Sequence, residues 1–212
     1  MYSAGCIWML LIAVGCASVG LTQAYSALQD ARIIAEYRRQ LGLNHTKIAR
    51  ELVHRANWAA VGSISTNDVV NGYPMVNIIS IDDNNLKGKS SGIIRFMLTD
   101  LDFTGPDWQN DNKVTFMFTD EQTLNCKNTN KDPMEPTCAR VIISGQVIKV
   151  PENSPSFKQE QAIFINRHPA AANWIKVHAF YLCELDIQNI FVLDFYGGPH
   201  KVSASDYYAI NI

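Results

Sequence analysis

Residues 113–150 read KVTFMFTDEQT, LNCKNTNKDPMEPTC and ARVIISGQVIKV, two apolar runs joined by a long polar segment. Lys113–Thr119 and Ala139–Val150 are rich in Val, Ile, Phe and Thr and partly alternate with polar residues, which is typical of strands. The Asn, Asp, Lys and two Pro residues between them favour neither strand nor helix. We therefore predict a β-hairpin with a long loop framed by Cys126 and Cys138. Loops of this length inside compact domains usually have a function.

The length and composition indicate one globular domain. A chain of 212 residues can bury a full core, and 47% hydrophobic with 18% charged residues is typical of a globular protein. The net charge is −2, and the sequence contains no basic cluster. Nucleic acid is therefore not expected as a partner.

The N-terminus has the pattern of a secretory signal peptide. Residues 1–29 contain no charged side chain, Ile7–Val14 is a short apolar run, and Thr22-Gln23-Ala24 offers a cleavage site. We predict a signal peptide over residues 1–24; a bacterial lipoprotein signal ending at Cys16 is the alternative. The apolar run is too short to span a bilayer, so we expect a secreted, extracellular or lysosomal protein without a stable membrane anchor.

The cysteines then divide into two groups. Cys6 and Cys16 would leave with the signal peptide, and Cys126, Cys138 and Cys183 would remain. In an oxidising compartment, the two cysteines that frame the loop are the natural disulfide pair, which would stabilise the fold by about 3 kcal/mol. The alternative is two separate thiols. Cys183 lies in an apolar run and is interpreted as a buried free thiol.

A secreted chain can be N-glycosylated, and the sequence contains one acceptor triplet. Asn44-His45-Thr46 is the only Asn-x-Ser/Thr acceptor in the chain; Asn153-Ser154-Pro155 fails because its third position is proline. We predict N-glycosylation of Asn44 in a polar gap between two helices.

The remaining sequence predicts helices before and after a set of strands. Gly42 ends the first of two amphipathic helices. The separation of the strands by turns, with a helix or two before the last strands, suggests a closed or nearly closed barrel of the α+β, mostly β class. The predicted helices are Leu28–Leu41, Thr46–Asn57 and residues 154–166; the other predicted strands are Trp58–Ser65, Tyr73–Ile81, Ile93–Thr99, Val177–Ile187 and Ile190–Phe195; Asp82–Gly92 is predicted as a flexible polar loop.

Two loop patterns fail the requirements of the sites that they resemble. Lys87–Ser91 is like the end of a phosphate-binding loop, but Asp83 stands where that pattern needs glycine. Asp100–Asp111 matches a calcium loop loosely, but it ends in Asp rather than the bidentate Glu and has strands on both sides. We interpret the first as a solvated loop and the second as an acidic turn between strands.

The sequence assigns no catalytic residue and no metal ligand. The five histidines show no metal-type spacing, and no hydrolase or redox motif is present. His54 is interpreted as a partly buried structural histidine. Arg167-His168-Pro169 is typical of a helix end, with anion binding as the alternative. Arg95, inside an apolar strand, is the most site-like residue, because its guanidinium must reach a carboxylate, a phosphate or water; the other interpretation is an outward-facing strand residue.

Several runs together resemble the CREG family, named for cellular repression of adenovirus early-gene-stimulated transcription. The resemblance covers the chain from about Ile48 to its end. It rests on the runs NWAAVGSIST, ARVIISGQVIKV, FINRHP, NIFVLDFYGGPHKV and DYY, together with the cysteine-framed loop.

The resemblance implies a fold and a way of acting. The expected fold is a split β-barrel like that of FMN-binding oxidases of the pyridoxamine-phosphate-oxidase type, over residues 46–212 and after a helical extension at 25–45. Family members are secreted or endolysosomal N-glycoproteins that form homodimers, with roles in growth and differentiation. In those of known structure, the loop corresponding to Asn125–Cys138 fills the flavin site between subunits. The resemblance therefore implies no cofactor and no enzyme activity.

The chain also departs from its relatives. It has one glycosylation acceptor, which supports a glycan-dependent sorting receptor as a partner. The acidic turn Asp100–Asp111 would repel a cofactor phosphate. The competing hypothesis is an FMN-dependent oxidoreductase with Arg95 as the phosphate contact. A nuclear, DNA-binding repressor conflicts with the signal peptide and the net charge.

Overall fold

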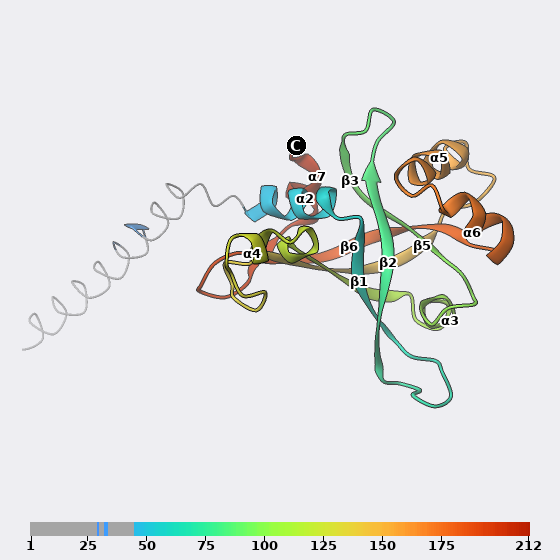
Figure 1. Ribbon diagram of the computed structural model, residues 1–212, viewed down its shortest axis with the longest axis horizontal. Coiled ribbons are helices and arrows are strands. Elements are labelled where there is room, and N and C mark those ends of the chain that lie inside the picture. Colours follow the sequence, from blue (N-terminus) through green and yellow to red (C-terminus); the bar gives the residue numbers. More distant parts are fainter. Residues whose placement is uncertain (1–28, 30–31, 34–44) are drawn as a thin grey trace, which may run out of the picture. The chain divides into compact units, whose positions relative to one another are not determined.

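The computed structural model describes residue 29, residues 32–33 and residues 45–212, and the last range contains one seven-stranded antiparallel sheet (Figure 1). The predicted signal peptide, Asn44 and most of the predicted helix 28–41 lie outside the described residues. The strands are β1 (Trp58–Ile64), β2 (Pro74–Asn84), β3 (Ser90–Leu98), β4 (Lys113–Thr119), β5 (Arg140–Lys149), β6 (Tyr181–Leu193) and β7 (His200–Val202). Their order is β3-β2-β1-β4-β5-β6-β7, and an additional β3–β6 pairing closes six of them into the predicted barrel.

The helices lie between or beside these strands (Figure 1). They are α2 (His45–Arg55), α3 (Thr104–Asn110), α4 (Asn125–Asn128), α5 (Phe157–Arg167), α6 (Ala171–His178) and α7 (Ala204–Ala209), with a 3₁₀ helix η1 at Asp120–Thr123. Within the described residues, each helix is too short or too polar to cross a bilayer.

The central hairpin forms as predicted. β4 pairs with β5 from Lys113↔Gln146 to Thr119↔Arg140. Alternate side chains of β4, those of Val114, Phe116 and Phe118, are buried inside the barrel, as a strand with one solvated face requires.

The barrel interior holds the main core, and α2 packs over it. Leu52 and Val53 of this amphipathic helix are buried, and α2 contacts β2, β3, β4, β5, β6 and β7. Burial of each such side chain stabilises the fold by about 1.5–3 kcal/mol. A second core lies beneath α5 and α6 and consists of Met97, Val150, Phe164, Ala171 and Leu182.

The prediction of a flexible loop over Asp82–Gly92 is wrong at both ends. β2 continues to Asn84 and β3 begins at Ser90, which leaves a short turn between them. Asp82 and Asp83 are fully buried within β2. A buried carboxylate is tolerated only when it is paired, and the basic partners of these two, His54 and Arg167, come from distant helices, which the local sequence does not reveal.

The two predicted late strands are one. The helix α6 extends to His178, where a strand was predicted, and β6 then runs without interruption to Leu193. A register shift in the β5–β6 ladder accommodates the polar pair Gln188-Asn189. Gly145 is needed there, because a Cβ atom at this position would lie 2.3 Å from the Asp186 carbonyl oxygen.

Four short helical elements were not predicted from the sequence. The loop after β4 contains η1 and one turn of helix, α4, although its composition argued against helix. The acidic turn contains α3, and α7 follows β7 near the C-terminus. Short helices of this kind depend on caps and tertiary contacts more than on propensity.

Candidate functional site

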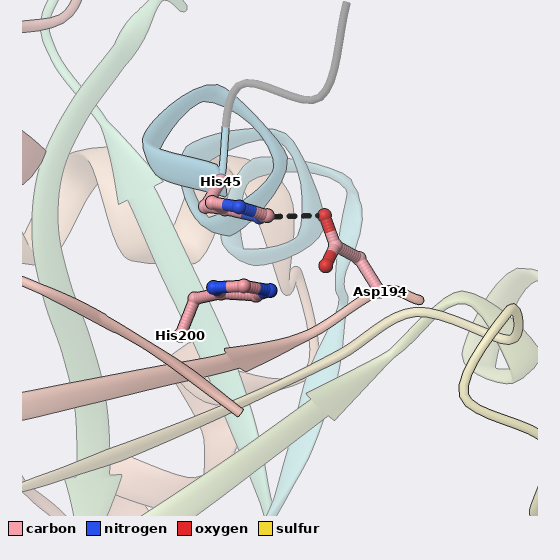
Figure 2. Close-up of side chains that lie close together, drawn as sticks. All are labelled: His45, Asp194 and His200. Carbon is pink, nitrogen blue, oxygen red and sulfur yellow. Dashed lines mark hydrogen bonds and ion pairs between the residues drawn. The ribbon is translucent and has the colours of Figure 1, made fainter. Parts of the chain in front are cut away.

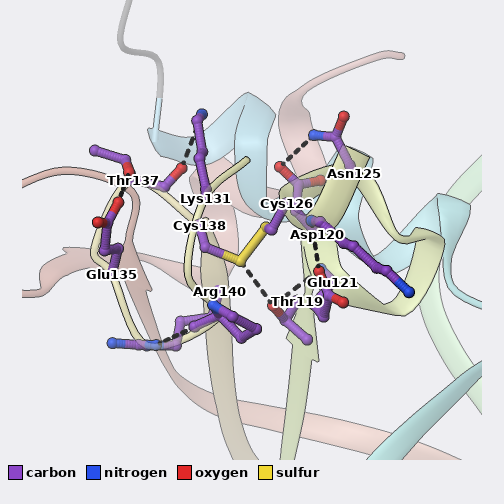
Figure 3. Close-up of a disulfide and its surroundings, with 12 residues drawn as sticks. Thr119, Asp120, Glu121, Asn125, Cys126, Lys131, Glu135, Thr137, Cys138 and Arg140 are labelled. Carbon is purple, nitrogen blue, oxygen red and sulfur yellow. Dashed lines mark hydrogen bonds between the residues drawn. A yellow bond between two sulfur atoms is a disulfide. The ribbon is translucent and has the colours of Figure 1, made fainter. Parts of the chain in front are cut away.

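The long loop after β4 is closed by a disulfide (Figure 3). Cys126 and Cys138 are joined with an S–S distance of 2.06 Å, and both side chains are buried. The predicted pairing is confirmed. The cross-link holds α4 against the start of β5.

Hydrogen bonds inside the loop stiffen it further (Figure 3). The guanidinium of Arg140 donates to the carbonyl oxygens of Pro133 and Met134, each at 3.1 Å. Lys131 Nζ donates to the Thr137 carbonyl at 3.2 Å. The loop therefore has a defined conformation of its own, as expected for an Ω-type loop with a function.

The base of the loop is tied to the barrel. Thr119 and Gln122 form a capping box around η1, and Gln122 also donates to the Trp58 carbonyl oxygen at the start of β1. Arg55, the last residue of α2, forms a 2.9 Å ion pair with Asp120. These contacts fix the direction in which the loop leaves the barrel.

Apolar side chains form a row across the outside of the barrel. Register pairs link Ile78 to Ala60, Ala60 to Met117, Met117 to Ile142, and Ile142 to Phe191, across β2, β1, β4, β5 and β6. We call Ile78, Met117, Ile142 and Phe191 the apolar stripe; they are 64%, 40%, 37% and 39% exposed. A contiguous exposed apolar patch of this kind marks an interaction surface.

A shallow hollow lies beside the stripe on the same strands. Its volume is about 570 Å³, and its lining includes Gly62, Ile64, Pro74, Thr115 and Ser144. Gly62 lacks a side chain where its neighbours on β2 and β4 have one, which helps to make the surface concave.

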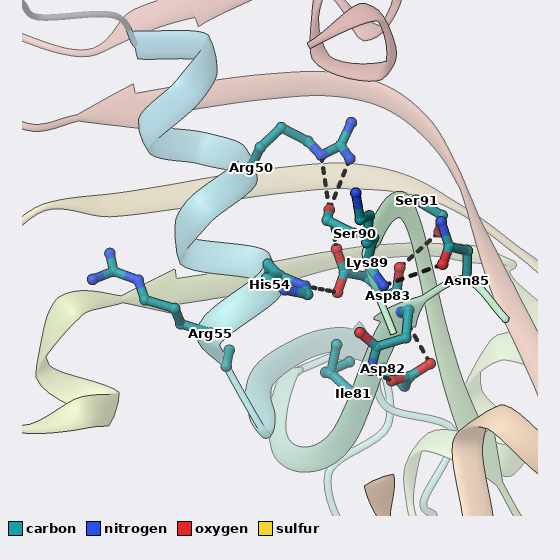
Figure 4. A network of polar contacts seen from close by, with 12 residues as sticks. Arg50, His54, Arg55, Ile81, Asp82, Asp83, Asn85, Lys89, Ser90 and Ser91 are labelled. Carbon is teal, nitrogen blue, oxygen red and sulfur yellow. Dashed lines mark hydrogen bonds and ion pairs between the residues drawn. The ribbon is translucent and has the colours of Figure 1, made fainter. Parts of the chain in front are cut away.

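The predicted structural histidine, His54, belongs to a buried polar network (Figure 4). Its Nδ1 lies 2.7 Å from Asp83 Oδ1, and Ser90 Oγ donates to Asp83 Oδ2. Arg50 donates to Ser90 Oγ at 2.7 Å and to the Tyr207 carbonyl at 2.7 Å. The serine contacts the carboxylate and not the histidine, so the arrangement differs from a nucleophile–base pair. It links α2 to β2, β3 and α7.

Arg167 ends α5, as predicted, and also caps a second helix. Its Nη2 donates to the carbonyl oxygens of His54 and Ala56, each at 2.8 Å. These groups lie at the C-terminal end of α2, where a cation is favoured by the helix dipole. Nη1 lies 3.7 Å from Asp82 and 3.8 Å from Asp83, so Arg167 also compensates the buried carboxylates.

Arg95 is buried and already has a carboxylate partner. It is 5% exposed, its Nε lies 2.9 Å from Glu184 Oε1, and Nη1 donates to the Asn84 carbonyl at 2.8 Å. Burial raises the pKa of Glu184, and the guanidinium of Arg95 opposes that shift. Arg95 also lines a hollow of about 400 Å³ with Gln159 of α5.

The acidic residues of the turn 100–111 make local hydrogen bonds. Asp107 is buried and accepts hydrogen bonds from Ser63 Oγ at 2.7 Å and from the Thr66 backbone at 2.7 Å. Asp102 accepts one from Asn77 Nδ2 at 2.8 Å. These contacts are those of a turn between strands.

Cys183 is the buried free thiol that was predicted. Burial raises the pKa of its thiol to about 12, which a nearby Lys149 only partly offsets. The neutral thiol is a poor nucleophile at physiological pH.

Comparison with known proteins identifies relatives of the whole barrel. The family model described as "CREG, beta-barrel" matches residues 41–209. The chain is 34% identical to Protein CREG1 from Homo sapiens over 166 residues, which cover 78% of this chain and 74% of the relative. It is 26% identical to Protein CREG2 from Mus musculus over 186 residues, covering 84% and 64% of the two chains. These names state no enzyme activity.

Solved structures share the fold at low sequence identity. A heme binding protein from Mycobacterium smegmatis superposes with a TM-score of 0.59 at 16% identity, covering 78% of this chain and 60% of that one. A protein of the pyridoxinephosphate oxidase family from Clostridium acetobutylicum, related to general stress protein 26, gives 0.51 at 12% identity, covering 78% and 100%. The predicted likeness to the flavin-binding split barrel is thus confirmed, and the chain belongs to the CREG family.

Proposed function

We propose that this protein is a non-catalytic glycoprotein of the secretory pathway that acts as a homodimer through protein contacts. It is secreted or endolysosomal and serves growth, differentiation or lysosomal homeostasis. Family membership, the secretory pattern of residues 1–24 and the acceptor triplet at Asn44 support this proposal.

The apolar stripe carries the homodimer part of the proposal. It extends over five neighbouring strands on the outside of the barrel, where a monomer would leave it in water. A second copy of the same chain can cover it through a two-fold axis, since an isologous interface uses the same patch on both subunits. The cores of homodimer interfaces are similarly apolar and poor in charged residues.

The disulfide loop gives each subunit a rigid surface for contacts with other proteins. Because it is cross-linked and internally hydrogen-bonded, it can be presented to another protein at a low entropic cost. We assign it two roles in the dimer: it fills the position in which flavin-binding relatives of the fold hold their cofactor, and it offers a fixed surface to a partner, with a glycan-dependent sorting receptor contacting the sugar at Asn44.

The homodimer is tested by charging the stripe. Ile142→Glu places a carboxylate at the centre of the proposed interface, and we expect the mature secreted protein to change from dimer to monomer at micromolar concentration. Val69→Glu is the matched control, because Val69 is 89% exposed in the β1–β2 turn and lies outside the stripe. Sedimentation velocity measures both variants. A monomeric wild type, or an unchanged Ile142→Glu dimer, would contradict the proposal.

The flavin-dependent oxidoreductase is the competing function. Its predicted phosphate contact, Arg95, is already paired with Glu184, which weakens its attraction for a phosphate. Purified protein with an absorption band near about 450 nm would favour this function over the binding role. Replacing residues 127–137 with a short Gly-Ser linker is a second test of the binding role against the oxidoreductase. The binding role predicts that this variant keeps an intact barrel and loses partner binding.

A further inference from the structure

Three polar side chains, one from the start of α2 and two from the connection between β6 and β7, meet beside the end of β6 (Figure 2). His45 is the first residue of α2, Asp194 follows β6, and His200 opens β7. His45 Nδ1 lies 2.8 Å from Asp194 Oδ2. The two imidazole rings are stacked, with centroids 3.8 Å apart and an interplanar angle of 12°.

The carboxylate of Asp194 is only half satisfied. The side chain is 2% exposed, and its second oxygen, Oδ1, is buried and meets no hydrogen-bond donor within the described part of the chain. Figure 2 shows this carboxylate directed toward the two rings. A buried carboxylate oxygen without a partner is unfavourable, so the position favours an additional positive group.

The two rings are arranged to supply ligands to such a group. An imidazole nitrogen is a common metal ligand, and two imidazoles lie here beside one carboxylate. One edge of each ring faces the side on which Asp194 lies (Figure 2). One ligand atom from each of the three residues lies within 4.8 Å of the others.

We propose that His45, Asp194 and His200 form a binding site for a divalent transition-metal ion of the zinc class. Two imidazole nitrogens and one carboxylate oxygen are common zinc ligands, and a fourth position remains for water or another ligand. In tetrahedral coordination at about 2.0–2.1 Å, ligand atoms lie about 3.4 Å apart. The two rings are now nearly parallel, so both must rotate out of their stack to direct a nitrogen at one ion, and the metal would then satisfy the second oxygen of Asp194.

The site would join the start of α2 to the connected strands β6 and β7. The start of α2, the end of β6 and the start of β7 would share one ion. Sequence spacing missed it, since His45 is remote and the Gly197-Gly198-Pro199 turn separates Asp194 from His200. Only the pairing of β6 with β7 brings these two residues together.

The test uses tag-free, mature protein secreted from cells and stripped of metal with a chelator. Isothermal titration with Zn²⁺ should give about one site per chain, and Co²⁺ should give the visible absorption of a tetrahedral or five-coordinate centre. We expect His200→Ala and Asp194→Asn each to weaken zinc binding on the order of 100-fold. His178→Ala removes an exposed histidine at the end of α6 and should bind zinc as the wild type does.

Circular dichroism of the metal-free variants separates folding from binding, and His200→Ala is decisive if Asp194→Asn does not fold. Zinc should raise the melting temperature of the wild type and of His178→Ala, but not that of His200→Ala. The proposal is overturned if the wild type takes up no zinc, or if His200→Ala binds it with unchanged stoichiometry and affinity.

Discussion

At the scale of single residues, long-range partners decide most of what the sequence leaves open. Arg50 is 1% exposed and lies over the Tyr207 ring, with its guanidinium 5.1 Å from the ring centroid. A position on the polar side of a helix gives no sign of such burial. The sequence did indicate that His54 and Arg95 need partners, because each lies in or beside an apolar run, but it could not name Asp83 and Glu184. A partner is set by the tertiary fold.

Gly92 is a residue at which one added carbon atom should disturb the buried network around Arg50. It has φ +80°, and a Cβ atom there would lie 2.8 Å from the Arg50 guanidinium carbon. Gly72 has nearly the same φ, +79°, with nothing within 4 Å of its added Cβ atom. Gly72→Ala should therefore lower the free energy of unfolding by about 1 kcal/mol through backbone strain alone. Gly92→Ala should lower it by at least about 2 kcal/mol.

Urea denaturation of both glycine variants measures the difference. Equal losses would show that Arg50 moves aside freely, and that the network around it is less rigid than its contacts indicate.

At the scale of elements, local patterns predicted the long strands and missed the short helices. β4 has the predicted bounds because its alternation of buried and exposed residues is a property of the segment itself. α4 is a four-residue turn of helix that contains Cys126 of the disulfide, so it depends on a contact that is distant in the local pattern. β6 was divided in two because the polar pair at its bulge resembles a turn. Periodicity therefore predicts the elements that bury one face. Bulges and short capped helices cannot be predicted in this way, because they depend on contacts with other parts of the chain.

The loop disulfide and the buried thiol together predict a thiol count. Mature protein should show no reactive thiol under native conditions, since Cys183 is fully buried and Cys126 is bonded to Cys138. Denaturation without reductant should expose one thiol, and reduction should expose three. Cys126→Ser with Cys138→Ser should lower stability by about 3 kcal/mol in the chain-entropy model.

A reaction with Ellman's reagent and a denaturant melt check both statements. Three thiols in the denatured, unreduced protein would mean either that the disulfide is absent or that Cys6 and Cys16 remain in the chain, and intact mass distinguishes these cases.

At the scale of the whole molecule, apolar packing stabilises the barrel, and a few buried charged groups make its stability depend on pH. Its class and closure followed from the count and length of the strands, together with the family resemblance. The apolar stripe could not be predicted, because its four members lie on four different strands and only the register aligns them. The charged network around α2 could not be predicted either, because its members also come together only in the folded chain.

Two buried carboxyl groups should make the protein more stable in mild acid. Burial raises the pKa of Asp82 above 3.8 and that of Glu184 above 4.5. The folded state therefore binds protons more tightly than the unfolded state. Their contribution to stability is fully present below the ordinary values and is lost as the pH rises through the raised ones. This direction agrees with the endolysosomal part of the proposed function.

Chemical denaturation from about pH 4 to pH 7 tests this dependence. Asp82→Asn and Glu184→Gln should each reduce the loss of stability with rising pH. Glu152→Gln, at an exposed position, should leave the slope as in the wild type. Slopes that are the same in all three variants would contradict the assignment.

The pairing of β3 with β6 has a consequence for biosynthesis. Phe96 faces Cys183 across that ladder, so the barrel stays open until the ribosome has delivered the last long strand. Until then β3 is an unprotected edge, and such edges invite misassembly. The thiol of Cys183 belongs to that last strand and emerges only with it. The hairpin of β4 and β5 is local and should form sooner, so its two cysteines can be oxidised with each other before a third competitor arrives. The order of synthesis thereby protects the correct cross-link.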